Sequence, residues 1–451
     1  MKILEQIHRM VWGPWTLGIF LGTGLFLSVK CRFFQIRGLP YWWRRTAGSL
    51  VSGTEQGRAA SSRRSSMTQF QSVCTALAAT VGTGNIAGVA TALTAGGPGA
   101  LFWMWVSAFI GMITAYSETV LGIGCRYRDG NGKYVCGPFV YMERLLGVKE
   151  MALLYSFLCL LCAMGMGSMV QANSAVETLY FTWRVPMPVG GFLFTMLVFA
   201  VIAGGASRIG NAAEKLIPAA SAVYIFFSLL IICCRLDHLP GALAAMLSSA
   251  FRPEPAAGGI LGYGISRSLR YGISRGVFSN EAGLGTLAVL HGAAEDATPH
   301  EQGMWAMFEV FFDTIVLCTM TAVVILCTAG PELSETSRQG AALASWCFGS
   351  CLGMPGEYLV SGAMVVFAFA TVIAWFYLGK QAAQYMTGDS RVFCVCIYPA
   401  LFLISVFWGS QARLALVWLL SDIWNGLMAF PNLTALLFLA DQVTLPDVWE
   451  K

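Results

Sequence analysis

The sequence predicts an all-α integral membrane protein with about eleven transmembrane helices, and three observations support this class. Of the 451 residues, 56% are hydrophobic and 12% are charged, whereas soluble domains contain roughly 25% charged residues. The apolar residues form stretches of about 20 residues, the length that a helix needs to cross a bilayer. A motif, Asn85–Gly88, returns as Asn280–Gly283 nearly half a chain later, and glycines interrupt the apolar stretch at both copies.

The apolar stretches define the predicted spans and their orientation. They cover residues 14–30, 68–96, 98–124, 151–180, 187–206, 211–235, 256–292, 304–329, 355–386, 391–410 and 412–440. The connection 30–67 carries eight Lys or Arg against one Glu, so the positive-inside rule places it in the cytoplasm. We therefore expect the amino terminus outside and, after eleven spans, the carboxyl terminus inside. The acidic connection 293–303 is also expected inside, since acidic residues contribute little to this rule.

The repeated motif divides the chain into two similar halves. After the first span, two consecutive blocks of five spans remain, and each begins with one copy of the motif. Blocks with an odd number of spans enter the bilayer from opposite sides, so any structural similarity between the two is that of an inverted repeat. The predicted regions are 1–66 (first span and basic connection), 67–235 (first repeat), 236–255 (outside connection), 256–440 (second repeat) and 441–451 (cytoplasmic tail).

Both motif copies are expected to lie where a helix is broken. Paired interruptions in corresponding helices mark the substrate site of secondary transporters, and the freed peptide groups must line a cavity rather than face lipid. Amides near Thr83 to Asn85 would suit a carboxylate, and carbonyls near Ala78 and Val81 a small cation. We expect the second break at Gly276. The alternatives are helix packing through small residues and, less compatible with the spacing, a nucleotide-binding loop.

Several polar or aromatic residues within the predicted spans could have either a structural role or a role in the site. Phe278 could belong to the core and Asn280 could cap a helix, or both could line the site. Gln171 could form an interhelical hydrogen bond or contact substrate. Glu281 needs a partner at membrane depth, and Arg275 or Arg270 could supply it.

Three further acidic residues lie in apolar stretches. Glu118 either pairs with Arg126 or Arg128, or caps amides freed by the second break. Asp313 and Asp422 are each candidates for a proton site, and spacing alone does not rank them.

Four long segments carry a resemblance to a known family. The segments Ala78–Ala90, Gly96–Trp105, Ser274–Gly285 and Asp422–Leu433 resemble the alanine or glycine:cation symporters, and the similarity extends from Trp12 to Leu439. The resemblance implies the inverted-repeat fold of the bacterial leucine transporter. It also implies sodium-driven, or sometimes proton-driven, uptake of small neutral amino acids, chiefly alanine and glycine.

The resemblance also implies roles for individual residues. Substrate would be bound by Thr83, Gly84, Asn85, Gln171, Phe278, Ser279 and Asn280, with Trp375 as a pocket wall. The backbone oxygens of Ala78 and Val81 and the Thr371 hydroxyl would hold Na⁺, as hard oxygen donors suit this ion. Independently of the resemblance, the predicted breaks and the buried acidic residues give Gly82, Gly276, Glu118 and Glu281 expected structural or gating roles.

The chain departs from the family pattern at three places. Ala370-Thr371 replaces a pair of threonines beside the cation position, which bears on ion identity and coupling. Thr286-Leu287-Ala288 and Cys136-Gly137-Pro138 also differ from the usual residues.

The expected function is secondary active symport in a bacterial-type inner (plasma) membrane. The expected partners are a small neutral amino acid, Na⁺ as coupling ion and membrane lipid, without a cofactor; the oligomeric state stays open. A proton-coupled carrier is the main alternative. A channel would need a continuous polar lining. A membrane enzyme is disfavoured because the sequence, with four His in total, contains no HExxH motif and no nucleophile elbow. The scattered net charge of +4 gives no nucleic-acid footprint.

Overall fold

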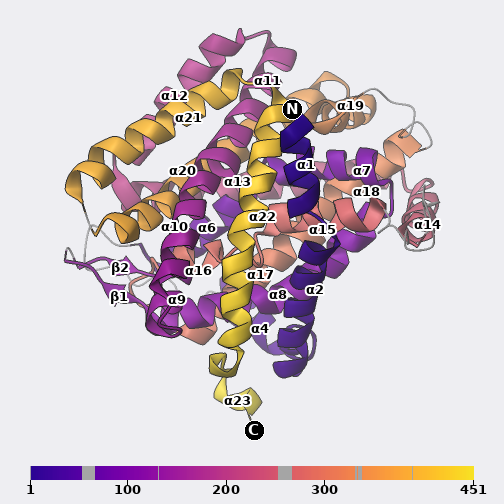
Figure 1. The fold of residues 1–451 in the computed structure, drawn as a ribbon. Helices are drawn as coiled ribbons and strands as arrows, with labels where there is room; N and C mark the ends of the chain where they lie inside the picture. Colours follow the sequence, from indigo (N-terminus) through magenta and orange to yellow (C-terminus); the bar gives the residue numbers. More distant parts are fainter. Residues whose placement is uncertain are drawn as a thin grey trace.

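The computed structural model describes residues 2–52, 67–130, 132–251, 267–330, 333, 338–388 and 390–450. Within these ranges the chain is helical apart from its loops and one short antiparallel hairpin, β1 (Tyr127–Arg128) and β2 (Tyr134–Val135). The two termini lie at opposite ends of the view in Figure 1, and α22 (Leu414–Phe438) runs along much of the distance between them. The all-α membrane architecture predicted from composition is confirmed.

Each predicted apolar stretch coincides with one or more helices. In chain order these are α2 (Pro14–Lys30); α6 (Gln69–Thr80) with η2 (Thr83–Asn85) and α7 (Ala87–Gly96); α8 (Ala100–Cys125); α10 (Lys149–Met164) with η3 (Gly165–Val170) and α11 (Gln171–Trp183); α12 (Met187–Ile202); α13 (Gly205–Cys234); α15 (Arg267–Asn280) with α16 (Thr286–His291); α17 (Pro299–Val310) with η4 (Phe311–Cys318) and α18 (Thr319–Ala329); α20 (Met354–Thr387); η6 (Phe393–Ile397) with α21 (Tyr398–Gln411); and α22. The helix positions therefore follow from the length of the apolar runs.

The number of membrane crossings is less firmly defined than the helices themselves. Eight helices of the described chain are long and apolar enough to cross a bilayer, and a bent pair, Gln69–Thr80 with Thr83–Gly96, makes a ninth. The helix Met187–Ile202 is shorter, and residues 256–266 of one predicted span lie outside the described residues. The total of eleven, including the additional first span, stays a prediction.

Several short elements were not predicted. They are α1 (Lys2–Val11), α3 (Phe34–Arg37), α4 (Leu39–Arg45), α5 (Ala47–Ser52), α9 (Pro138–Arg144), α14 (Leu239–Ala250), α19 (Gly340–Leu352), η7 (Ala440–Gln442), α23 (Asp447–Glu450) and the hairpin. Most lie in connections between spans, where the apolar stretches are too short to predict a helix. Figure 1 shows α14 and α19 at the right edge of the molecule, away from the pair formed by α12 and α21.

The two broken helices lie against each other with their halves paired. The Ser72 hydroxyl on α6 donates to the Leu290 carbonyl on α16, at 2.6 Å. The Ser268 hydroxyl on α15 donates to the Gly96 carbonyl at the end of α7, also at 2.6 Å. The first half of each broken helix thus contacts the second half of the other, so the two run antiparallel. This is the arrangement expected of corresponding helices in an inverted repeat.

Candidate functional site

The first break, residues 81–86, lies where the sequence predicted it. The helical hydrogen bonds of α6 end with the Val81 amide on the Leu77 carbonyl, and the two halves of the span meet at 50°. Two amides turn to side chains instead: that of Gly82 donates to Asn85 Oδ1 at 2.9 Å, and that of Thr83 to Gln171 Oε1 at 3.1 Å. The broken helix is therefore held by its own Asn and by a Gln from α11.

The second break, residues 281–285, lies five residues beyond the predicted position. The helix α15 continues through Gly276 to Asn280, so the predicted break at Gly276 is wrong. The backbone turns only at Glu281, Gly283 and Gly285, whose φ angles are +57°, +93° and +78°. A Cβ on Gly276 would lie 2.4 Å from Ser107 Oγ on α8, so this glycine serves close helix packing.

A buried polar network joins the two breaks. Asn85 Nδ2 donates to Asp313 Oδ1 at 2.6 Å, and the Thr314 hydroxyl donates to Asp313 Oδ2 at 2.9 Å. Asn280 Nδ2 in turn donates to the Thr314 hydroxyl, at 3.1 Å. Asp313, on the π-helical segment η4, thus lies between the asparagines of the two motif copies, Asn85 and Asn280. The sequence marked Asp313 only as one of two possible proton sites, and its contact with Asn85 could not be read from spacing.

Glu281 has different partners from those predicted. Its carboxylate accepts from Trp375 Nε1 at 2.9 Å and from the Thr286 hydroxyl at 2.5 Å. Neither Arg275 nor Arg270 is among its hydrogen-bond or ion-pair partners in the described chain, so that prediction is wrong. These contacts fix Trp375 on α20 against the second break, and a Cβ on Gly167 would lie 2.4 Å from the Trp375 side chain.

Arg275 instead forms a buried ion pair with Asp422 on α22. Its two terminal nitrogens lie 3.1 and 2.6 Å from the two carboxylate oxygens, and His8 Nε2 on α1 lies 3.3 Å from the same carboxylate. The guanidinium also lies 4.7 Å from the Trp418 ring centroid. Asp422 is therefore the acidic member of an ion pair between two helices. Asp313 has no such cationic partner among its contacts in the described chain, so it is the better candidate for a proton site.

Glu118 takes the second of the two roles considered for it. Its Oε1 accepts from the Gly285 amide at 3.1 Å and from Asn432 Nδ2 at 2.6 Å. It caps an amide that the second break leaves free, and this contact stabilises the start of α16. Among the described residues, Arg126 and Arg128 contact other groups.

The predicted cation position brings together two of its three residues directly. The Thr371 hydroxyl on α20 donates to the Val81 carbonyl at 3.3 Å and to the Phe367 carbonyl at 3.0 Å. Ala78 lies fully buried one turn before Val81 on α6. Carbonyl and hydroxyl oxygens at a helix end are donors that suit a small hard cation, so the residues present fit Na⁺.

All predicted substrate contacts are buried, and one of them lacks a partner. The side chains of this set are exposed by at most 3%. The Thr83 hydroxyl has no hydrogen-bond partner among the described residues, although buried polar groups are nearly always paired. The Thr83 hydroxyl is therefore available to a ligand at the first break.

Two polar residues on α22 escaped the sequence analysis. The Ser421 hydroxyl and Asn425 Oδ1 are buried and, within the described chain, have no hydrogen-bond partner. Both face η3, since a Cβ on Gly165 would lie 3.0 Å from Ser421 Oγ and Asn425 Nδ2 contacts Met166 Sδ at 2.7 Å. The signal available in the sequence was their presence in an apolar helix that also carries Asp422.

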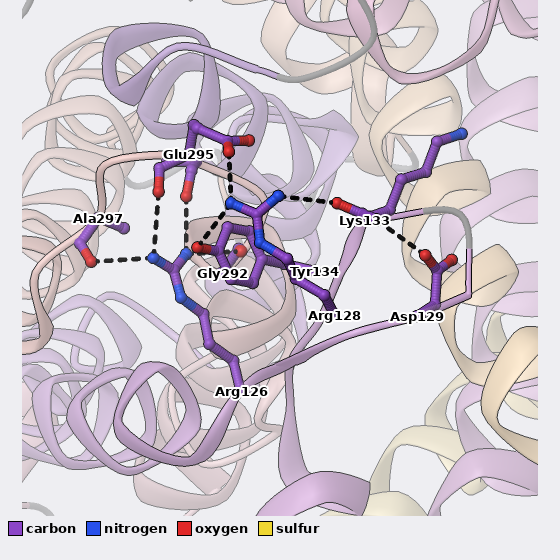
Figure 2. Close-up of polar contacts among 10 residues, drawn as sticks. Arg126, Arg128, Asp129, Lys133, Tyr134, Gly292, Glu295 and Ala297 are labelled. Atoms are coloured by element: carbon purple, nitrogen blue, oxygen red, sulfur yellow. Dashed lines mark hydrogen bonds and ion pairs between the residues drawn. The ribbon is translucent and has the colours of Figure 1, made fainter. Parts of the chain in front are cut away.

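The segment after α16 is held by an arginine clamp, shown in Figure 2. Arg126 donates to the carbonyls of Gly292, Ala294, Glu295 and Ala297 at 2.6 to 3.3 Å. Arg128 forms an ion pair with Glu295 at 2.5 Å. This contact, and second the hydrogen bond that Arg128 donates to the Tyr134 hydroxyl, raise the pKa of Arg128. Both guanidinium groups lie over the Tyr134 ring, 3.8 and 4.4 Å from its centroid. The end of α16 is thereby fixed to the hairpin.

We expect the Arg126→Met variant to lose substantial stability, because four carbonyls lose their donor. Hydrogen bonds to charged groups contribute about 1.5–3 kcal/mol each when their partners stay buried. The matched control is Arg128→Met, whose exposed ion pair contributes about 0–1 kcal/mol. The measurement is the apparent melting temperature of the detergent-purified variants. Equal melting temperatures for the two variants would contradict the clamp.

Comparison with known proteins agrees with this architecture. The model of the sodium:alanine symporter family matches residues 1–446. The sodium/alanine symporter AgcS of Methanococcus maripaludis is 38% identical over 449 residues, which cover 98% of this chain and 95% of the relative. An uncharacterized transporter of Haemophilus influenzae is 38% identical over 441 residues, covering 97% and 93%. The crystal structure of MhsT in complex with L-phenylalanine has a TM-score of 0.61 at 14% identity, covering 84% of this chain and 93% of that chain.

The family model and the relatives, together with the fold, show that the chain is a multi-pass membrane transporter of the leucine-transporter fold rather than an enzyme. Within that class, the chain belongs to the sodium:alanine symporter family. The family resemblance read from the four sequence segments is thus confirmed.

Proposed function

We propose that the protein couples Na⁺ entry to the uptake of a small neutral amino acid, alanine or glycine, by alternating access. The observation that carries this proposal is the first break, where amides that leave the helical hydrogen-bond pattern donate to side chains and the unpaired Thr83 hydroxyl lies fully buried beside the second broken helix. A zwitterion needs an anion-binding and a cation-binding group close together, and the start of a half-helix supplies the first. The relative AgcS is named a sodium/alanine symporter.

The substrate carboxylate is proposed to bind at Thr83, Gly84 and Asn85. These residues open the second half of the broken helix, where backbone amides carry partial positive charge. A Cβ on Gly84 would lie 3.5 Å from the Phe278 ring and 3.6 Å from the Ser279 side chain. Phe278 and Ser279 are therefore in contact range of a molecule bound at Gly84, and Gln171 and Asn280 complete the polar set.

The walls of this site favour a small side chain. Trp375 is fully buried and its indole nitrogen is fixed by Glu281. Phe278 packs against Trp418, with ring centroids 4.8 Å apart and ring planes tilted by 33°. Aromatic groups packed this closely leave little freedom to move aside, so a methyl group or hydrogen is the side chain we expect the site to accept.

Na⁺ is proposed to bind at the carbonyls of Ala78 and Val81 and the Thr371 hydroxyl. An ion at this point would stabilise the end of α6 and thereby the geometry of the first break. By linkage, the ion then raises the affinity for the amino acid, and the amino acid raises the affinity for the ion by the same factor. The helices of the two breaks, with α8 and α17 beside them, would move against α20 and its neighbours to open the site to the other side.

The function is tested by uptake of labelled alanine into proteoliposomes with and without a Na⁺ gradient at equal pH on both sides. We expect uptake that depends on Na⁺ and competition by glycine and alanine, but not by glutamine or phenylalanine. Uptake that is unchanged without Na⁺ would contradict sodium coupling. Serine and D-alanine in the same competition series define the tolerance of the pocket for a hydroxyl and for the opposite hand.

We expect Thr371→Val to raise the Na⁺ concentration for half-maximal uptake by about tenfold. The variant removes one oxygen ligand but keeps the side-chain shape, and about 1.4 kcal/mol of lost ion binding corresponds to that factor. The control Thr371→Ser keeps the hydroxyl and should stay within about twofold of the original protein. An unchanged Na⁺ dependence in Thr371→Val would place the ion elsewhere.

A further inference from the structure

Three buried side chains outside the proposed substrate and Na⁺ positions form a closed hydrogen-bonded group. His291 is the last residue of α16, and Gln302 and Glu309 lie on α17. The two ring nitrogens of His291 have separate partners: Nδ1 lies 2.6 Å from Gln302 Oε1, and Nε2 lies 3.1 Å from Glu309 Oε2. All three residues are fully buried. Ionisable residues at such depth are costly and usually functional.

The partners of His291 fit the doubly protonated ring. A neutral imidazole has one donor and one acceptor nitrogen, whereas the imidazolium has two donors. Here both nitrogens face an acceptor oxygen, so the arrangement suits an imidazolium between a carboxylate and an amide oxygen. The opposite charges of His291 and Glu309 then neutralise each other in a buried environment.

The same three side chains can also hold the neutral ring. The two ends of a Gln amide are nearly identical in shape, so a half-turn of the Gln302 amide would present Nε2 to Nδ1. Gln302 Nε2 and Glu309 Oε1 have no hydrogen-bond partner among the described residues, so the half-turn breaks no other contact of the amide nitrogen. The group can therefore gain or lose one proton without rearrangement of either helix backbone.

The titratable groups around this cluster do not supply a second positive charge beside Glu309. Cys74 on α6 and Glu281 at the second break lie within electrostatic reach of Glu309, and Glu214 on α13 faces Cys74. His300, at the start of α17, contacts Tyr116 on α8 instead. In the described part of the chain, His291 is the basic side chain paired with Glu309. No group of three or more His, Cys, Asp or Glu that could hold a metal occurs among the described residues, so a proton is the ligand that this group fits.

We propose that His291, Gln302 and Glu309 form a proton-binding site that sets how firmly α16 is held to α17. Loss of the proton leaves the Glu309 carboxylate buried without a counter-charge, which weakens the contact between the two helices. Because α16 is the second half of a broken helix, we expect its contact with α17 to loosen within the moving group of helices during the transport cycle. This last consequence rests on the proposed transport function, whereas proton binding itself does not.

The first test measures the proton directly in the purified full-length protein. The ¹⁵N signals of the His imidazoles are followed by NMR between pH 5 and 9.5, and the His291 signal is assigned by its loss in His291→Gln. We expect a transition from two protonated nitrogens to one. In Glu309→Gln the midpoint should move to lower pH by about one unit or more, since an opposite charge at this distance favours the charged ring. The control Glu301→Gln, in the first turn of the same helix, should leave the midpoint unchanged.

The second test measures alanine uptake at equal pH on both sides with saturating Na⁺. We expect uptake to rise at least about threefold across the pH range of the His291 transition, because the ring is the side chain that titrates near neutral pH. Uptake by His291→Gln and Glu309→Gln should be nearly independent of pH over that range, and Glu301→Gln should follow the original profile.

The two tests separate the failure of this proposal from that of the proposed function. A His291 signal without a transition between pH 5 and 9.5 would overturn the proton site, even if alanine is transported. A transition together with pH-independent uptake would overturn its link to transport. A transition in a protein that transports no alanine would support the proton site and overturn the proposed function instead.

Discussion

Uptake of alanine is expected to fall at least about tenfold when Gly82 is replaced by Ala. A Cβ at this position would lie 2.7 Å from Thr371 Oγ1 and 3.1 Å from Gln171 Oε1. Both atoms are already engaged, Thr371 with the Val81 carbonyl and Gln171 with the Thr83 amide. The added methyl must displace at least one of them, and a shift of about 1 Å in a positioned group commonly costs about a hundredfold in function.

A matched control separates this effect from a general intolerance of the broken helix. A Cβ on Gly88, on α7, would lie 4.0 Å from its nearest neighbour, Trp418. Ala in a helix is more favourable than Gly by about 1 kcal/mol, so Gly88→Ala should fold normally and transport within about twofold of the original protein. The measurement is initial alanine uptake normalised to the amount of protein in the membrane. Equal uptake by the two variants would show that the contacts around Gly82 are not needed for transport.

The sequence was sufficient to locate the helices and the first break. Apolar runs long enough to cross a bilayer have few alternatives to a helix, because every backbone group must be paired within lipid. The run Val81 to Asn85 combines two glycines with a Thr and an Asn, residues whose side chains compete for backbone partners. Both effects are local, so they could be read without knowledge of the fold.

The second break could not be placed because a glycine has two different uses in a helix. Gly276 allows the close approach of Ser107, whereas Gly283 and Gly285 adopt positive φ angles. The sequence does not distinguish a missing side chain from a special backbone conformation. Only the contact with α8 shows which glycine serves which purpose.

The partners of the buried charged residues could not be predicted from the sequence either, because they lie on helices that are distant along the chain. Arg275 lies on α15, whereas Glu281 follows the last residue of that helix, at the point where the backbone turns. Arg275 therefore meets Asp422 on α22, and Glu281 meets Trp375 on α20. The long-range pairing also decided that Asp313, not Asp422, contacts Asn85.

We expect Asp422→Asn to destabilise the protein by about 3–5 kcal/mol, the usual effect of leaving one member of a buried ion pair unpaired. The guanidinium of Arg275 is held on two carboxylate oxygens and is about nine-tenths buried with its partner. The Asn amide could accept one of these hydrogen bonds but supplies no negative charge. The control is Asp441→Asn, which removes the ion pair of Lys30 with an aspartate whose side chain is 96% exposed. Such surface pairs contribute about 0–1 kcal/mol.

The double variant Arg275→Met with Asp422→Leu distinguishes loss of charge balance from loss of a required contact. Replacement of both members of a buried pair by apolar residues is often neutral for stability, so the double variant should recover much of the apparent melting temperature that Asp422→Asn loses. Its alanine uptake should stay low if the pair joins α15 to α22 as part of the transport cycle, because an apolar contact does not separate and re-form with the same specificity. A melting temperature of Asp422→Asn equal to that of Asp441→Asn would show that the pair does not hold the two helices together.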